Sequence, residues 1–398
     1  MANTPNIRFK GFTDDWEQHE LCDIYGKIRN AFVGTASPYY VENGHFYLES
    51  NNVKDGHINH NNEVFINDEF YEKQRDNWLH TGDIVMVQSG HVGHSAVIPE
   101  ELNNTAAHAL IIISNPQTEI DPYFLNAEFQ TPLKKKNIDI ITKGNTIKHI
   151  LASDMKEFEV SLPNIREQRD ISAFFRILDK ILIIHQRRLE DLKNFKKVML
   201  QKMFPSDGES IPEIRFFGFS DAWEQRKLGE VAQITMGQSP DGSTYSDTPS
   251  DYILVQGNAD LKDGWVSPRI WTTQKTKTAA AGDLIMSVRA PAGAMGKTAY
   301  DVVLGRGVAG IKGNEFIYQT LVKMDSNGYW NRLAAGSTFE SVNSDAVNNA
   351  EIMIPQDMAE QDRIGDYFKQ LDSLITLHQH KYENLLKMKK YLLQQMFC

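Results

Sequence analysis

The chain has 398 residues, of which 41% are hydrophobic, 24% are charged and only two are cysteines, and its formal net charge is -10. This length exceeds one ordinary core and predicts at least two domains, and the absence of an apolar run of about eighteen residues excludes a membrane span and predicts a cytoplasmic protein. Cys22 and Cys398 lie near opposite ends, which excludes a disulfide framework and a Cys-x-x-Cys metal pair.

The first predicted domain covers residues 1–160 and opens with IRFKGFTDDWEQHEL, from Ile7. Short strand-like runs such as GDIVMVQ, from Gly82, are bounded by Gly, Pro, Asn and Asp, and a helix is predicted from Tyr123 to Phe129. Asp121 and Pro122 precede that helix, a pair that suits a helix start. These elements predict a mixed α/β domain.

A long helix is predicted next, over residues 161–205. Apolar residues recur there at alternating steps of four and three, the spacing typical of a coiled coil. The stretch from Asn164 to Phe204 carries ten Lys and Arg against five Asp and Glu, so this helix is basic within an acidic chain.

The second half of the chain repeats the first. IRFFGFSDAWEQRKL, from Ile214, matches the opening segment, and Glu360-Gln361 matches Glu167-Gln168. The sequence therefore predicts a second mixed α/β domain over residues 206–355, with a helix from Phe316 to Met324, and a second long helix over residues 356–398.

The repeat has similar ends and different interiors. This pattern favours one scaffold that presents two different recognition surfaces. Gene duplication followed by drift, without a division of function, is the alternative.

The two long helices carry equivalent apolar rows, and we predict that they pack on each other. At 1.5 Å per residue, about 38 residues form a rod of roughly 55 Å that would separate the two globular domains. Lys196 and Lys389 occupy equivalent positions in the rows and are expected to extend to the edge of the seam. The apolar seam residues are Ile171, Phe175, Leu178, Leu182, Leu189 and Leu192 in the first helix, and Ile364, Phe368, Leu371, Ile375, Tyr382 and Leu385 in the second.

The stretch MSVRAPAGAMGKTAY, residues 286–300, ends as a nucleotide-binding loop does, with Gly-Lys-Thr. Pro291 replaces the first glycine of that motif and has no N–H to donate to a phosphate. Residues 299–304 read as a strand, whereas the motif should open a helix. In the first copy, His94 stands where the second copy has Lys297. The pattern therefore favours a turn with different ligand contacts in the two copies over a nucleotide site.

These motifs together resemble the DNA specificity subunit of Type I restriction-modification enzymes. Besides the repeated opening segments, SLPNIREQRDI from Ser161 and MIPQDMAEQDRI from Met353 match the family's entry into its long helices. ITMGQSPDGSTYSD, from Ile234, is similar to a loop of the family's target recognition domains. The resemblance covers essentially the whole chain. It implies two α/β target recognition domains joined by two antiparallel helices, with pseudo-two-fold symmetry.

The same resemblance implies a non-catalytic DNA reader. Each variable domain would recognise one half of a bipartite, asymmetric target in double-stranded DNA, and the helices would fix the spacer between the halves. Two methyltransferase subunits would dock on the assembly, with restriction subunits added in the full complex. No cofactor is expected on this chain, because S-adenosylmethionine and ATP would belong to the partner subunits.

Candidate DNA contacts lie in predicted loops of both domains. Arg289 and Lys297, on a strand end and a turn of the second domain, are the leading candidates, since Arg can bind guanine bidentately and Lys more often meets a phosphate. Two solvated charges on a hairpin are the alternative. With a net charge of -10, this chain alone should bind DNA weakly and in a salt-sensitive way. The other candidates are Arg29, Asn30, Ser89, His91, His94, Asn145, Thr146 and Lys148 in the first domain, and Gln238, Ser239 and Thr338 in the second.

Two enzyme-like patterns are incomplete. Asp-Pro-Tyr-Phe, from Asp121, lacks the second proline of the amino-methyltransferase motif, and no Gly-rich loop for the methyl donor follows a strand. His91 and His94 form a His-x-x-His pair without a third metal ligand nearby in sequence. We therefore predict no catalytic and no metal site. A stand-alone DNA-modifying enzyme with a degenerate site, and a coiled-coil scaffold without DNA affinity, are the alternative functions.

Overall fold

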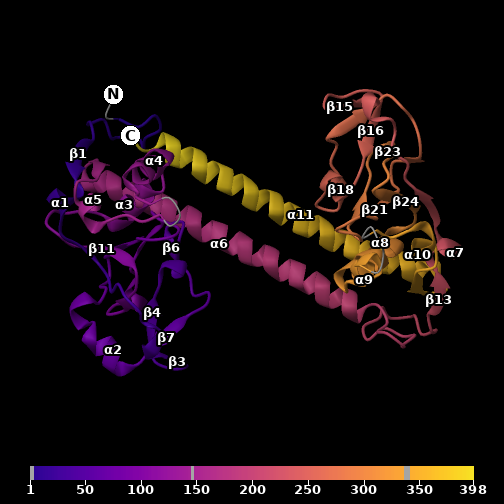
Figure 1. The fold of residues 1–398 in the computed structure, drawn as a ribbon, viewed down its shortest axis with the longest axis horizontal. Coiled ribbons are helices and arrows are strands. Elements are labelled where there is room, and N and C mark those ends of the chain that lie inside the picture. Colours follow the sequence, from indigo (N-terminus) through magenta and orange to yellow (C-terminus); the bar gives the residue numbers. More distant parts are fainter. Residues whose placement is uncertain (1–3, 145–147, 336–340) are drawn as a thin grey trace. The chain divides into compact units, whose positions relative to one another are not determined.

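The computed structural model describes residues 4–144, 148–335 and 341–398. The chain divides into two units, the first formed by Met1–His185 with Tyr382–Cys398 and the second by Gln186–Lys381. Each unit contains one mixed α/β domain and part of both long helices, α6 (Ile165–Lys202) and α11 (Met358–Gln395), drawn in magenta and yellow in Figure 1. Both helices have 38 residues, and the predicted fold class is confirmed.

The main sheet of the first unit has four strands in the order β2-β11-β8-β9, and all neighbours are antiparallel. Its two central strands are runs of Ile, Val, Leu and Met that are buried on both faces, as expected for strands covered on two sides. The strands are β2 (Tyr25–Asn30), β8 (Ile84–Val87), β9 (Ser95–Val97) and β11 (Leu110–Pro116).

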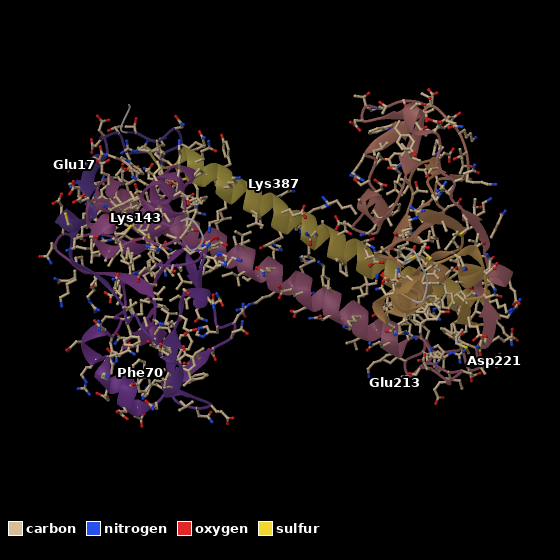
Figure 2. The ribbon with its side chains drawn as sticks, in the orientation of Figure 1. Glu17, Phe70, Lys143, Glu213, Asp221 and Lys387 are labelled. Carbon is tan, nitrogen blue, oxygen red and sulfur yellow. The ribbon has the colours of Figure 1, made fainter. Side chains whose placement is uncertain are left out.

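A second sheet of the first unit, in the order β10-β4-β7-β3, packs with the short helix α2 (Asp68–Lys73). Phe70 of α2, labelled in Figure 2, is fully buried and stacks on Tyr39 with ring centroids 4.1 Å apart. The strands of this sheet are β3 (Tyr40–Val41), β4 (His45–Leu48), β7 (Val64–Ile66) and β10 (Ala106–Ala107).

The remaining elements of the first unit connect these sheets to the long helices. The predicted helix after Asp121 is confirmed: Pro122 is its first residue, and the Asp121 carboxylate accepts the Tyr123 N–H at 2.9 Å. These elements are β1 (Glu17–Glu20) paired with β12 (Glu159–Leu162), the hairpin β5 (Val53–Lys54) and β6 (His57–Ile58), and the helices α1 (Leu21–Ile24), α3 (Pro122–Phe129), α4 (Pro132–Ile141) and α5 (Ala152–Lys156).

The second unit repeats the main sheet in the order β14-β24-β21-β22 and extends it with β18 and β17. The strand order and the antiparallel pairing match those of the first unit, so β14, β24, β21 and β22 correspond to β2, β11, β8 and β9. The strands are β14 (Gln233–Met236), β17 (Leu261–Lys262), β18 (Trp265–Val266), β21 (Leu284–Ser287), β22 (Met295–Lys297) and β24 (Val308–Lys312).

The second unit also has a five-stranded sheet, in the order β15-β19-β16-β23-β20. The helix predicted near residues 316–324 is confirmed as α8 (Glu315–Ser326). The other elements are β15 (Tyr245–Ser246), β16 (Tyr252–Val255), β19 (Ile270–Thr272), β20 (Thr278–Ala279), β23 (Val302–Leu304), β13 (Glu224–Lys227) paired with β25 (Glu351–Ile354), and the helices α7 (Leu228–Val231), α9 (Tyr329–Ala335) and α10 (Ser344–Asn348).

Each unit joins the opening segment of one repeat to the helix end of the other. Trp16 of the first repeat packs on Phe397, just after α11, with ring centroids 6.0 Å apart. Trp223 of the second repeat packs on Phe204, just after α6, at 5.8 Å. Both tryptophans are buried. The repeated sequence at the ends of the two copies is therefore the sequence that builds these two junctions.

The repeated Glu-Gln pairs lie at the starts of the long helices. Arg8 binds Glu167 through two hydrogen bonds of 2.6 and 2.7 Å, and Arg215 binds Glu360 with the same two distances. Both glutamates are almost completely buried. A guanidinium matches a carboxylate with two parallel bonds, so each pair fixes the opening segment on its helix.

The seam residues of the two helices pack on each other within each unit. In the first unit, Ile171, Phe175, Leu178 and Leu182 share a core with Tyr382, Leu385 and Leu392. In the second unit, Leu192, Met199 and Met203 share a core with Ile364, Phe368, Leu371 and Ile375. Early residues of α6 thus meet late residues of α11, and the reverse, which makes the pairing antiparallel in both units. Leu189 is also buried.

The two seam lysines form ion pairs between the helices. Lys196 of α6 lies 2.6 Å from Asp372 of α11, and Lys389 of α11 lies 2.5 Å from Asp179 of α6. All four side chains are mostly enclosed. The expectation that these lysines extend to the edge of the seam is therefore wrong, because each finds a carboxylate on the facing helix.

Among the described residues, no helix combines the length and the apolarity that crossing a membrane requires.

Candidate nucleic-acid interface

In each main sheet, the loops at one end of the strands carry most of the predicted DNA contacts. In the second unit, the ends of β14 and β21 flank the start of β24, because these neighbours are antiparallel. Gly237 N–H donates to Val308 O and Val288 N–H donates to Gly307 O, both at 2.9 Å. The segments after β14 and β21 and the turn before β24 therefore lie side by side. We call residues 237–239, 288–290 and 305–307 the loop edge of the second unit.

Two exposed arginines, Arg289 and Arg306, lie on this loop edge. The range 206–355 contains six arginines. The other four each contact a described partner: Arg215 with Glu360, Arg226 with Glu230, Arg269 with Asp260, and Arg332 with the carbonyl of Asn327. Within the described part of the chain, no residue pairs with the guanidinium of Arg289 or Arg306. These two side chains can therefore bind an external anion or base edge.

Gln238 and Ser239 lie beside these arginines. The Gln238 side chain is exposed, and the backbone carbonyl of Gln238 accepts a hydrogen bond of 2.6 Å from the Thr276 hydroxyl. Ser239 Oγ accepts the Arg306 N–H at 3.1 Å, so this serine fixes the arginine's backbone. The backbone carbonyl of Lys277 accepts the Leu304 N–H at 2.7 Å, which places this exposed lysine near the turn as a third cation.

The first unit has the corresponding loop edge, residues 30–32, 88–91 and 107–109. Ala31 N–H donates to Leu110 O at 2.8 Å, and Gln88 N–H donates to Ala109 O at 3.4 Å. The Gly90 N–H to Lys148 O hydrogen bond, at 3.1 Å, joins the segment around Lys148 to this edge. The structure thus brings Asn30, Ser89, His91 and Lys148 together, and all except the half-buried Ser89 are exposed. The Lys148 ammonium lies 3.4 Å from Asp139 at the surface.

The side chains of Arg29 and His94 are occupied by contacts within their own domain, which makes them less available for the DNA contacts predicted for them. The Arg29 guanidinium donates to the Asn77 side chain and to the Asp76 carbonyl, and burial lowers the pKa of Arg29. The His94 Nδ1 accepts the Asp55 N–H at 3.2 Å, and burial lowers its pKa against the opposing effect of the Asp55 carboxylate. Both side chains therefore hold their own domain together.

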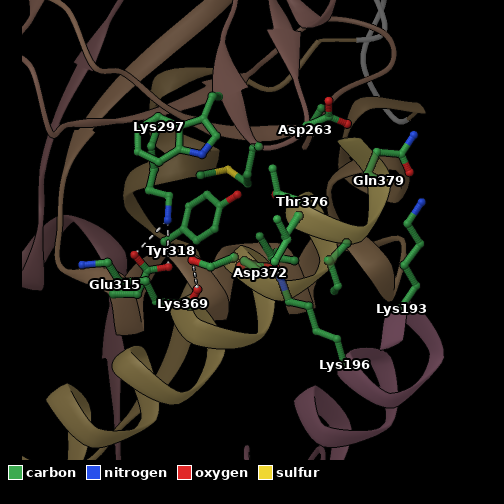
Figure 3. Close-up of a pocket in the computed structure, with 18 of the residues that line it drawn as sticks. Lys193, Lys196, Asp263, Lys297, Glu315, Tyr318, Lys369, Asp372, Thr376 and Gln379 are labelled. Carbon is green, nitrogen blue, oxygen red and sulfur yellow. Dashed lines mark hydrogen bonds and ion pairs between the residues drawn. The ribbon is translucent and has the colours of Figure 1, made fainter. Parts of the chain in front are cut away.

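Lys297 lies at the end of β22 and not on a turn, so its predicted position is wrong. Leu284 pairs with Lys297 and Ile84 pairs with Val97, so Val97 is the equivalent residue in the first unit, and the predicted match of Lys297 to His94 is also wrong. Its ammonium lies 2.9 Å from Glu315 Oε2 and over the ring of Tyr318, 4.5 Å from the centroid (Figure 3). The side chain is only 13% exposed. The charge of Lys297 is already neutralised by Glu315. Arg306 therefore replaces Lys297 as the second leading candidate for a DNA contact. The strand at 295–297 also shows why the stretch 286–300 is no nucleotide loop.

Three predicted contacts, Asn145, Thr146 and Thr338, lie outside the described residues. Within the described ranges, no group of three or more His, Cys, Asp or Glu side chains is arranged to hold a metal ion. The His91 and His94 rings lie 6.4 Å apart, and His94 is occupied by the Asp55 contact.

The sequence matches a family model at two places, residues 13–194 and 220–387, and that family is the Type I restriction modification DNA specificity domain. The chain belongs to this family. Its match to two copies of the domain agrees with the two units of the structure.

Individual relatives agree with this assignment. One relative is the "Putative type I restriction enzyme MjaX specificity subunit" of Methanocaldococcus jannaschii, to which the chain is 26% identical. The match covers 95% of this chain and 91% of the relative. The fold of this chain is similar to the crystal structure of a Type I restriction-modification system S subunit from M. genitalium, with a TM-score of 0.69, 14% identity and 99% of both chains covered. It is also similar, with a TM-score of 0.55 and 19% identity over 96% and 97% of the two chains, to a chain studied for complex assembly and conformational transition of the type I R-M system.

The two specificity domains differ at equivalent positions of their loop edges. Met86 pairs with Ile111 and Met286 pairs with Ala309, which sets the correspondence between the two sheets. By that register, Ser89 corresponds to Arg289 and His108 to Arg306. The His108 ring lies 3.0 Å from the Gly34 carbonyl and 3.4 Å from Glu49, so it is held inside its own domain.

Sequence reasoning missed Arg306 in this specificity-domain chain. The available signal was Gly305-Arg306-Gly307 between the strand-like runs of β23 and β24, which marks a tight turn with one charged side chain. Only the hydrogen bonds of the folded sheet place that turn beside Arg289 and Ser239.

Proposed function

We propose that this chain is the DNA sequence-recognition subunit of a Type I restriction-modification complex. Each globular domain reads one half of a bipartite target in double-stranded DNA through its loop edge. The observation that carries the proposal is that the same sheet edge, built twice, presents different side chains: Asn30, His91 and Lys148 in one unit, and Gln238, Arg289 and Arg306 in the other. Unlike readers on a common scaffold select unlike half-sites, so the target is asymmetric.

The electrostatics of the chain support a shared task with partner subunits. The net charge of -10 opposes attraction to the DNA backbone, whose neutralisation supplies most non-specific affinity. A few exposed cations on the loop edges can select bases but give weak binding by themselves. In this proposal, partner subunits supply the remaining phosphate contacts, and two linked half-site readers gain affinity through effective concentration.

An exposed apolar surface on the long helices provides a docking site for methyltransferase subunits in this proposal. A set of exposed apolar residues flanks the rows of seam residues, and each of them directly precedes a position of a row; the rows include His185 and His378. Eight of them are Ile181, Ile184, Met388 and Tyr391 in the first unit, and Phe195, Val198, Leu374 and Leu377 in the second. One position along a helix is a rotation of about 100°, so these residues flank the seam on the same side of an antiparallel pair. We call these two sets the flanking apolar stripes.

The stripes suit the binding of two equal partners. Ile181 and Ile184 correspond in the repeat to Leu374 and Leu377, and Phe195 and Val198 correspond to Met388 and Tyr391. Each unit therefore offers a similar apolar face, and large exposed apolar patches on a protein surface mark interaction sites. Two methyltransferase subunits dock there, one at each stripe, and restriction subunits join the full complex. S-adenosylmethionine and ATP bind to those partners, and this chain is non-catalytic.

A methylation assay tests the proposal. The purified chain should transfer no methyl group from S-adenosylmethionine to DNA. With its methyltransferase partner it should direct methylation to one split, asymmetric sequence. Methyl transfer by this chain alone, or methylation by the complex without a bipartite target, would show that the proposal is wrong.

A further inference from the structure

Hydrogen bonds fix the backbone of the turn before β24, which carries Arg306. Gly305 N–H donates to Val255 O at 2.7 Å, and Val308 N–H donates to Gly305 O at 3.2 Å. Ser239 Oγ accepts the Arg306 N–H at 3.1 Å. A Cβ on Gly307 would lie 2.0 Å from Gln256 O, so this position accepts only glycine. The turn therefore holds Arg306 in one place while its side chain extends into solvent.

Arg306 and Arg289 are neighbours through the backbone of the sheet. The Val288 N–H to Gly307 O bond joins the residue before Arg289 to the residue after Arg306. Neither guanidinium has a described carboxylate partner, whereas exposed Arg269 in the same domain pairs with Asp260 at 2.7 Å. The two exposed arginines therefore start from neighbouring positions of the sheet, and an electronegative ligand bound there could meet both cations.

The geometry points to Arg306 as a specificity-determining residue that reads a guanine in the second half-site, and we propose this role for it. The inference rests on the proposed DNA-reading function. A guanidinium presents two parallel N–H groups that match the O6 and N7 acceptors of guanine in the major groove. A fixed backbone reduces the ordering cost of that contact. Ser239, which holds the Arg306 N–H, is the positioning residue.

The first domain provides no such reader at the equivalent position. His108 replaces Arg306 there and contacts Gly34 and Glu49, and Ser89 replaces Arg289. The arginine-guanine contact is therefore specific to the half-site read by the second domain. The two halves of the target differ in part because only one domain presents this pair of arginines.

The test uses the full chain in complex with its methyltransferase subunits and maps the methylated sites by sequencing. Arg306→Lys keeps the charge but loses the two parallel donors. Both Arg306→Lys and Arg306→Ala should lower discrimination at one guanine of one half-site by about 10- to 100-fold. The other half-site should stay unchanged. Arg226→Ala is the matched control. Arg226 is an exposed arginine of β13, outside the main sheet, and pairs with Glu230, so its loss should leave the methylated motif unchanged.

The outcomes separate this inference from the proposed function. If Arg306 contacts a phosphate, Arg306→Lys will methylate like the wild type, and Arg306→Ala will slow methylation uniformly at an unchanged motif; either result would overturn the inference. A wild-type complex without any bipartite motif would instead overturn the proposed function. Ser239→Ala should weaken the same guanine preference by a smaller factor, and its thermal unfolding should match the wild type, since Ser239 lies in a surface loop.

Discussion

At the scale of single residues, Asp179 shows how the helix pair is fixed by charge as well as by apolar packing. Its carboxylate lies 2.5 Å from Lys389 and 3.3 Å from His57. Burial raises the pKa of Asp179, but the bonds from His57 and Lys389 outweigh that effect, and the pKa lies below its ordinary value. The charged form is therefore the one that stabilises the first unit.

Removing that charge should destabilise the first unit. Asp179→Asn leaves Lys389 enclosed without a counter-ion, and the loss of one partner of a buried pair costs about 3 kcal/mol or more of unfolding free energy. Denaturant unfolding at pH 7 measures this loss. The double variant Asp179→Asn with Lys389→Met should recover part of it, because no unpaired charge remains. An unchanged unfolding midpoint in the single variant would contradict the role of the pair.

The same pair predicts a pH dependence with a definite sign. A carboxylate whose folded pKa is lowered contributes stability above its unfolded pKa, near 3.9. That contribution disappears as the pH falls through the lowered folded pKa. The stability difference between wild type and Asp179→Asn should therefore shrink below about pH 4, where the wild-type carboxylate becomes protonated. A difference that grows below about pH 4 would exclude this assignment. Unfolding midpoints over this pH range provide the measurement.

At the scale of secondary-structure elements, the long helices have two separate surfaces. The seam residues are buried, and the flanking apolar stripes beside them are exposed. A helix with apolar residues on only one narrow face would need no further partner. The second apolar face is therefore the feature that distinguishes a docking surface from a simple strut.

Acidic substitutions in one flanking apolar stripe should impair docking of the methyltransferase subunit without impairing folding of the chain. Ile181→Asp with Ile184→Asp should weaken the affinity of that stripe for its methyltransferase subunit by more than 10-fold, since burying unpaired carboxylates at an interface is costly. Size-exclusion chromatography with light scattering measures the stoichiometry, and we expect one partner instead of two. Lys193→Glu with Lys197→Glu controls for added negative charge, because these exposed residues of the same helix directly follow seam residues and lie on the other side of the pair. Full assembly with two partners would show that the stripe is not the docking surface.

The helices also offer a test of the proposed spacer. Seven residues inserted after His185 and seven after Lys381 add one full repeat of the seam to each helix, about 10 Å. At about 3.4 Å per base pair, the methylated half-sites should move apart by about three base pairs. Sequencing of the methylated sites reads the spacer directly. An unchanged spacer would show that the helices do not set it.

At the scale of the whole molecule, the two units are alternative versions of one design. Each has the same four-stranded core sheet, the same arginine-glutamate pair and the same tryptophan-phenylalanine junction. The sheets added around this core differ, with four strands in the first unit and five in the second. This arrangement allows one reader to change while the junctions that hold it stay constant.

Exchange of a whole domain tests that modularity. Residues 1–160 replaced by the first domain of another family member should give a complex whose methylated motif changes in one half-site only. The second half-site and the spacer should remain, because the second unit contributes its own readers. Altered preference in both halves would contradict independent reading by the two domains.

The sequence by itself determined the repeat, the two mixed α/β domains, the 38-residue helices and their seam, because these features depend on periodic and local patterns. It also predicted Arg289 and Gln238, which are exposed on the loop edge. The sequence could not show which of Lys297 and Arg306 is the better candidate for a DNA contact. Only the tertiary structure decided that Glu315 neutralises Lys297, whereas the Arg306 guanidinium has no partner among the described residues, because Glu315 lies on a helix that reaches Lys297 only after the sheet has formed.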